Sequence, residues 1–130
     1  MKIIMLSGNQ NTGKTTTLKL VYDQLAQNMP SPPQAQPIQG GDYGDFESSP
    51  LRHNGKTVAI YSLGDTLYRI YEAIIKYCGT VDVFIVACST RQGISGFNAL
   101  VAYVQAYPQH CVISKTKNND ADCQGIIGNI

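Results

Sequence analysis

The sequence predicts a single α/β domain over residues 1–130, in three layers, with helices on both faces of a mostly parallel five-stranded sheet. Short apolar segments alternate with segments of helical periodicity, which is typical of a parallel sheet. An Asn-Gly pair at 54–55 separates two extended segments and predicts a hairpin. We therefore expect one arm of that hairpin to form an antiparallel strand at an edge of the sheet.

The first two elements are an apolar strand and an amphipathic helix, with a glycine-containing loop between them. Residues 2–7 form a short, mostly apolar segment of the kind found in buried strands. From residue 14 onward, apolar side chains recur at helical spacing and share one face. These are Leu18, Val21, Tyr22, Leu25 and Met29.

A long loop and the hairpin follow. Four prolines within residues 29–37 exclude a helix there, so we expect residues 29–45 to form a flexible loop, with room for a short strand at 37–39. A loop of this length in a compact domain is usually functional or disordered, and both a switch-like segment and a surface linker stay open. In the hairpin over 46–62, Pro50 places the first arm at the sheet edge.

The rest of the chain alternates helices and strands. Apolar spacing and stop signals predict helices near residues 67–78, 95–106 and 120–130, and strands at 81–88 and 111–114. We expect the order across the sheet to be the first hairpin arm, the second arm, strand 2–7, strand 81–88 and strand 111–114.

Composition and charge argue against several classes of protein. A net charge of +1 without basic runs gives no indication of a nucleic-acid or membrane surface. No apolar segment approaches the roughly 20 residues of a membrane helix. We expect no signal peptide, because Met1-Lys2 leads directly into the predicted first strand. We expect a cytoplasmic protein whose cysteines are mostly buried and reduced. They are Cys78, Cys88, Cys111 and Cys123.

The loop after the first strand matches the pattern G-x-x-x-x-G-K-[ST]. Glycines at 8 and 13 allow the backbone to approach a phosphate closely, and N–H groups at the helix start form an anion site. In this pattern Lys14 reaches the β- and γ-phosphates, and Thr15 places its hydroxyl on Mg²⁺. The predicted binding residues are Gly8, Asn9, Gln10, Asn11, Thr12, Gly13, Lys14, Thr15 and Thr16.

With its flanking strand and helix, this loop resembles the Walker A loop of the P-loop NTPase and kinase superfamily. The order of elements extends the resemblance over about the first 115 residues. Residues 62–65 and 88–93 also resemble a group of short bacterial P-loop proteins with no assigned activity. The resemblance implies a P-loop NTPase fold that binds a nucleoside triphosphate, ATP or GTP, together with Mg²⁺.

Three further positions are candidates for catalysis. Asp65 follows a strand predicted to neighbour that of the glycine loop, so it could hold Mg²⁺ with Thr15, orient water, or cap the next helix. Asp42 and Asp45 both resemble in their placement the acid that accepts a hydroxyl proton in P-loop small-molecule kinases; the alternative is that they are turn residues. Arg91 could neutralise phosphate charge as an arginine finger, or lie on the surface.

The base and the reaction are less well defined. Thr116-Lys117-Asn118-Asn119 resembles the [NT]-K-x-D guanine motif, but its last residue is Asn, which offers one acceptor oxygen, so we favour ATP over GTP. Three functions stay open: nucleotide hydrolysis, phosphoryl transfer by a small-molecule or nucleotide kinase, and a nucleotide-dependent switch with little turnover that binds a protein partner. The absence of an arginine-rich segment after residue 88 argues against a kinase.

Overall fold

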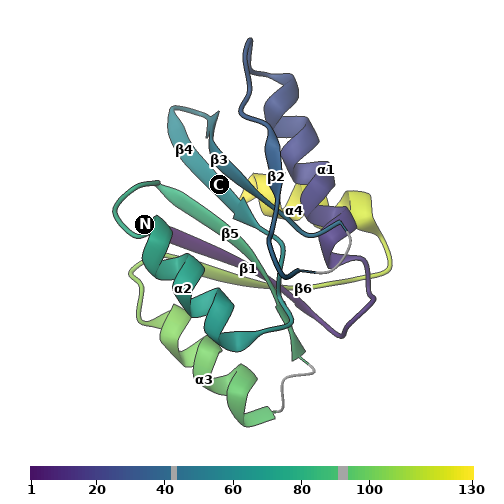
Figure 1. The fold of residues 1–130 in the computed structure, drawn as a ribbon, viewed down its shortest axis with the longest axis vertical. Coiled ribbons are helices and arrows are strands. Elements are labelled where there is room, and N and C mark those ends of the chain that lie inside the picture. The colour runs from purple at the N-terminus through teal and green to yellow at the C-terminus, as the bar shows by residue number, and fades with distance from the viewer. Residues whose placement is uncertain (42–43, 91–93) are drawn as a thin grey trace.

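The computed structural model describes residues 1–41, 44–90 and 94–130. Within them, one six-stranded sheet has the order β2-β3-β4-β5-β1-β6, and helices cover both of its faces (Figure 1). The elements are β1 (Lys2–Gly8), α1 (Lys14–Gln27), β2 (Ala35–Pro37), β3 (Phe46–His53), β4 (Lys56–Tyr61), α2 (Leu67–Tyr77), β5 (Val83–Ser89), α3 (Ile94–Gln105), β6 (His110–Ser114) and α4 (Asn119–Gly128).

The sheet is mixed and mostly parallel, which confirms the predicted α/β class. β5 pairs in parallel with β1 and β4, and β1 pairs in parallel with β6. β2, β3 and β4 pair antiparallel to one another in that order. The hairpin turn is also as predicted, because Asn54 and Gly55 both have positive φ, 50° and 76°.

Two apolar cores lie on opposite faces of the sheet, because successive side chains of a strand point to opposite sides. In β1, Ile3 and Met5 face the core under α2 and α3, whereas Ile4 and Leu6 face the core under α1 and α4. All four are fully buried. The three-layer arrangement expected from the sequence is therefore present.

The predicted position of β1 is wrong. It was expected beside the second hairpin arm, but β5 lies between β4 and β1. The helix α2 joins β4 directly to β5 as a neighbouring parallel strand, with Val58 opposite Val83. Every position of β5 is buried, as expected of a strand inside the sheet.

The predicted edge of the sheet is also wrong, because the structure adds a sixth strand. β2 pairs with β3 and covers the first hairpin arm, so β3 is not at the edge. Pro50 is accommodated where the pairing of β3 with β4 shifts register, between Ser48 and Leu51. β2 begins two residues before the short strand expected at 37–39, and it is itself the edge strand of the sheet.

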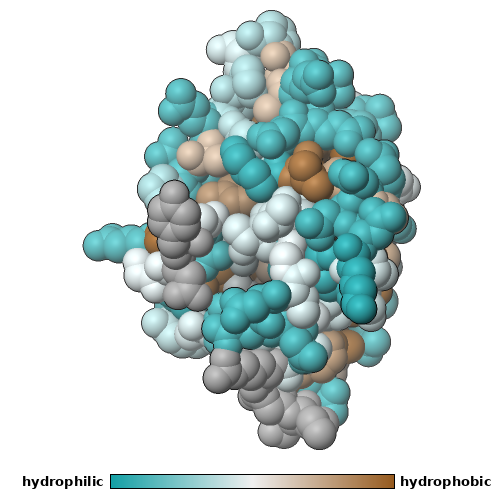
Figure 2. Space-filling model, turned by 90° about the vertical axis from the view of Figure 1, so that its right-hand side faces the viewer, coloured by the Kyte–Doolittle hydropathy of each residue, from teal (hydrophilic) through white to brown (hydrophobic). Residues whose placement is uncertain are grey.

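On the face shown in Figure 2, hydrophilic residues predominate and hydrophobic ones form small separate patches. None of the helices in the described part of the chain has the length and apolar character needed to cross a membrane. All four thiols are free, but Cys78 is exposed rather than buried, because it follows the last turn of α2.

Candidate functional site

The glycine loop, residues 8–15, connects the end of β1 to the start of α1. Gly13 caps α1 with φ 89°, a value that favours glycine. A Cβ added at Gly8 would lie 2.9 Å from Cβ of Lys115, so a side chain at this position would collide with the segment after β6. The two glycines of the motif are therefore required by the shape of the loop.

Lys14 folds back over the glycine loop. Its Nζ donates hydrogen bonds to the carbonyls of Gly8 at 2.9 Å and Asn9 at 2.7 Å. The side chain is buried, and this burial lowers the pKa of the Lys14 ammonium, an effect partly opposed by the nearby carboxylates of Asp65 and Asp45. The glycine loop thus holds a positive charge that has lost its hydration.

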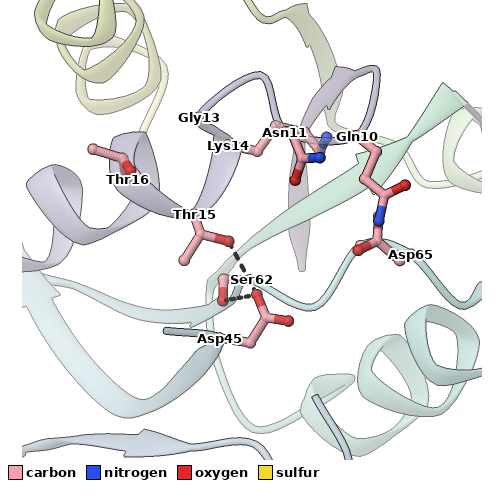
Figure 3. Close-up of a pocket in the computed structure, with 10 residues that line it drawn as sticks. Gln10, Asn11, Gly13, Lys14, Thr15, Thr16, Asp45, Ser62 and Asp65 are labelled. Atoms are coloured by element: carbon pink, nitrogen blue, oxygen red, sulfur yellow. Dashed lines mark hydrogen bonds between the residues drawn. The ribbon is translucent and has the colours of Figure 1, made fainter. Parts of the chain in front are cut away.

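A cavity of about 350 Å³ opens at the start of α1 (Figure 3). Side chains from the glycine loop form one wall, and residues near the ends of β3 and β4 form the other. The lining residues are Gln10, Asn11, Gly13, Lys14, Thr15, Thr16, Asp45, Ser62, Gly64 and Asp65. Most of the predicted binding residues therefore meet in one polar cavity.

Asp45 lies against Thr15 in this cavity. The Thr15 hydroxyl donates to Asp45 Oδ1 at 3.0 Å, and the Ser62 hydroxyl donates to the same oxygen at 3.3 Å (Figure 3). Asp45 is buried, with 8% of its surface exposed. Of the two acids that the sequence offers as a base, Asp42 lies outside the described residues. Counting pairs back from the turn at 54–55 would set Asp45 opposite Gly64, beyond the end of β4, because the register shift between Ser48 and Leu51 has no clear signal in the sequence.

Asp65 also lines the cavity but is exposed and lies near Gln10, apart from the Thr15–Asp45 pair (Figure 3). It is not the cap of α2, because that position belongs to Thr66. The predicted pairing of Thr15 with Asp65 assumed that β4 neighbours β1, whereas β5 separates the two strands. The carboxylate hydrogen-bonded to Thr15 in the described structure is that of Asp45.

Gly64 brings the chain after β4 against the end of β5. A Cβ at Gly64 would lie 2.7 to 2.9 Å from backbone atoms of Ala87 and Cys88. The Ser89 amide donates to the Gly64 carbonyl at 2.7 Å. This close approach carries Asp65 across β5 toward the glycine loop. Arg91, which follows β5, lies outside the described residues.

The segment after β6 is held together by a buried ion pair. Lys115 Nζ lies 2.8 Å from Asp122 Oδ2, with the two side chains 1% and 5% exposed. Asp122 also accepts hydrogen bonds from the backbone amide and the hydroxyl of Thr116. Burial alone would raise the pKa of Asp122, but the hydrogen bonds from Lys115 and Thr116 outweigh it and hold the pKa below its ordinary value.

The two asparagines of the guanine-like segment also have partners within the fold. The Asn118 side chain caps α4 by accepting from the Ala121 amide at 2.9 Å. Asn119 Oδ1 accepts from the Thr17 hydroxyl and lies 3.3 Å from where a Cβ of Gly13 would be. The Asn119 contacts lie against Gly13 and the first turn of α1, whereas the Asn118 contact lies within the start of α4. Neither asparagine is among the residues that line the cavity.

The described residues contain no cluster of three or more His, Cys, Asp or Glu side chains that could hold a metal ion. No protein-family model, no curated protein and no solved structure gives a significant match to this chain.

Proposed function

We propose that this protein binds a nucleoside triphosphate with Mg²⁺ at the glycine loop and hydrolyses it, as the resemblance to P-loop NTPases implies. The main support for the proposal is the position of Lys14, whose buried ammonium lies against the glycine loop at the start of α1. Backbone N–H groups there and the positive end of the helix dipole favour an anion.

The size and polarity of the cavity suit the phosphate chain. At about 350 Å³ it lies near the lower end of the range for small-molecule sites, so it accommodates phosphates more readily than a whole nucleotide. Phosphate oxygens would supply the Lys14 ammonium with the negative partner that its desolvated charge favours. The base would extend beyond the cavity, and the proposal names no preferred base.

The donor set fits Mg²⁺. This ion prefers oxygen ligands, takes few from the protein, and usually binds through one or two carboxylates together with phosphates and water. The hydroxyl of Thr15 and the carboxylates that line the cavity are such ligands. When bound, Mg²⁺ would neutralise charge on the phosphates. Asp65, exposed at the open side of the cavity, is the residue that we assign to positioning the attacking water.

One observation favours the switch as a second candidate function. Asp45 is the last residue of the long loop before β3, and it is hydrogen-bonded to Thr15 in the glycine loop. A ligand that engages Thr15 would therefore alter a contact that fixes the end of this loop. Low turnover, with loop 29–45 becoming protease-resistant when a non-hydrolysable triphosphate binds, would favour the switch over hydrolysis.

The binding test compares Lys14→Ala with Lys19→Ala, using calorimetric titration with a non-hydrolysable triphosphate and Mg²⁺. Removing a charge-assisted contact with phosphate costs about 1.5–3 kcal/mol, so Lys14→Ala should weaken binding roughly 10- to 150-fold. Lys19 is a matched control, because it lies on the same helix, is half-exposed and pairs with Asp23. Equal affinities of the two variants would refute the site.

The reaction is tested separately by phosphate release. Protein with nucleotide and Mg²⁺ alone should release phosphate, and Asp65→Asn should slow release while the affinity for a non-hydrolysable triphosphate stays within about threefold. Transfer that occurs only after a pool of metabolites is added would instead favour a kinase.

A further inference from the structure

Resting on the nucleotide site proposed above, we infer that Asp45, and not Asp65, is the carboxylate that ligates the magnesium ion together with Thr15. The sequence pointed to Asp65 because a carboxylate at the end of a neighbouring strand was expected there. The structure supplies a different residue, from the segment that precedes β3.

The oxygens of Thr15 and Asp45 have the spacing of two adjacent ligands of a magnesium ion. Mg²⁺ holds six oxygens at 2.0–2.1 Å in nearly ideal octahedral geometry, so two adjacent ligands lie about 2.9 Å apart. Thr15 Oγ1 and Asp45 Oδ1 are 3.0 Å apart. The pair therefore already spans one edge of such an octahedron, and a metal ion could contact both oxygens with little movement of either side chain.

Hydrogen bonds hold the Asp45 carboxylate in place. Ser62 donates to its Oδ1, and the Ser62 hydroxyl is itself fixed by the Phe46 amide, which donates to it at 2.8 Å. The Asp45 side chain also lies close to Gly41, since a Cβ added there would be 3.1 Å from Asp45 Cβ and 3.3 Å from its Oδ2. A buried carboxylate positioned in this way loses little conformational freedom when it binds a cation.

Asp65 lies in a different part of the cavity from Asp45. Its carboxylate is exposed, and Figure 3 shows it near Gln10 rather than beside Thr15. The position of β5 between β4 and β1 explains why the chain after β4 reaches the cavity from the side of Gln10. The two carboxylates of the cavity thus have separate tasks, with Asp45 on the metal and Asp65 toward the attacking group.

The test measures how much Mg²⁺ strengthens nucleotide binding. Wild type, Asp45→Asn, Asp65→Asn and the exposed control Asp23→Asn are titrated with a non-hydrolysable triphosphate, once with excess Mg²⁺ and once with EDTA. The ratio of the two dissociation constants is the magnesium gain. Asn keeps the size of Asp and an acceptor oxygen for Thr15, but removes the negative charge that attracts the ion.

We expect the magnesium gain of Asp45→Asn to fall at least about tenfold below that of wild type. Its affinity in EDTA should stay the same or increase, because a negative charge near the phosphates has been removed. Asp65→Asn and Asp23→Asn should keep most of the gain.

Three outcomes overturn the inference, and they separate its failure from the failure of the proposed function. Wild type that binds triphosphate while Asp45→Asn keeps the full gain would overturn the inference alone, and so would loss of the gain in Asp65→Asn only. Wild type that binds no triphosphate with or without Mg²⁺ would overturn both the inference and the proposed function.

A second measurement needs no substitution at Asp45, in case that variant does not fold. Mn²⁺ replaces Mg²⁺ in wild type with bound triphosphate, and its paramagnetism broadens the NMR signals of nearby amides. The amides of Thr15 and Phe46 should broaden more than that of Thr66. The reverse order would place the metal on the side of Asp65 and overturn the inference.

Discussion

Replacing Gly64 by alanine tests how the chain after β4 reaches the site. The added Cβ would lie 2.7 Å from the backbone carbon of Ala87, about 0.7 Å closer than the 3.4 Å at which ordinary contact begins. The obstructing atoms belong to β5, a central strand paired on both sides, so they cannot move aside without disturbing the sheet. Overpacking usually costs about 1–3 kcal/mol, and we expect the upper end here.

Gly125→Ala provides the matched control, because the substitution is identical and the surroundings are open. Gly125 lies inside α4, and a Cβ there would meet nothing within 4 Å. Alanine should therefore stabilise the helix by about 0.5–1 kcal/mol. Urea denaturation measures both free energies of unfolding, and they should differ by about 4 kcal/mol. A Gly64→Ala variant as stable as wild type would refute the close approach to β5.

Two further predictions concern residues 115–122, which follow β6. Asp122→Asn leaves the buried ammonium of Lys115 without a negative partner, so at neutral pH we expect a loss of about 3 kcal/mol in urea denaturation. Since the folded-state pKa of Asp122 is lowered, its contribution is present above its unfolded pKa near 3.9 and is lost as pH falls through the folded value. Stability should therefore fall less steeply below about pH 5 in Asp122→Asn than in wild type, and parallel curves would contradict this. Because Asn118 and Asn119 are held within the fold, ATP and GTP should bind with affinities within about threefold in calorimetry. A tenfold preference for either nucleotide would show that residues other than Asn118 and Asn119 recognise the base.

Features set by local sequence were predictable. The Asn54-Gly55 turn needs positive φ at both residues, and few other dipeptides adopt it easily, so the hairpin could be located. The start of α1 after the glycine loop followed from the glycines and the helical spacing of apolar residues. Both depend on interactions among near neighbours in the chain.

Features set by pairing between distant segments were not predictable in the same way. The apolar pattern of β5 does not indicate whether the strand lies between β4 and β1 or between β1 and β6, because both positions bury it on two faces. The position of β5 decides which carboxylate is hydrogen-bonded to Thr15, and in the structure this is Asp45 rather than Asp65. Similarly, the contact of Asn119 with Thr17 joins residues far apart in sequence and leaves no local signal.

The central claim is that the start of α1 holds a polyphosphate, and an NMR titration of backbone amides tests it most directly. On addition of a non-hydrolysable triphosphate with Mg²⁺, the amide signals of Gly13, Lys14 and Thr15 should shift more than those of any other segment. These shifts should disappear in Lys14→Ala and persist in Lys19→Ala. Saturable binding that leaves the three amides unchanged, with shifts gathered elsewhere, would contradict the claim.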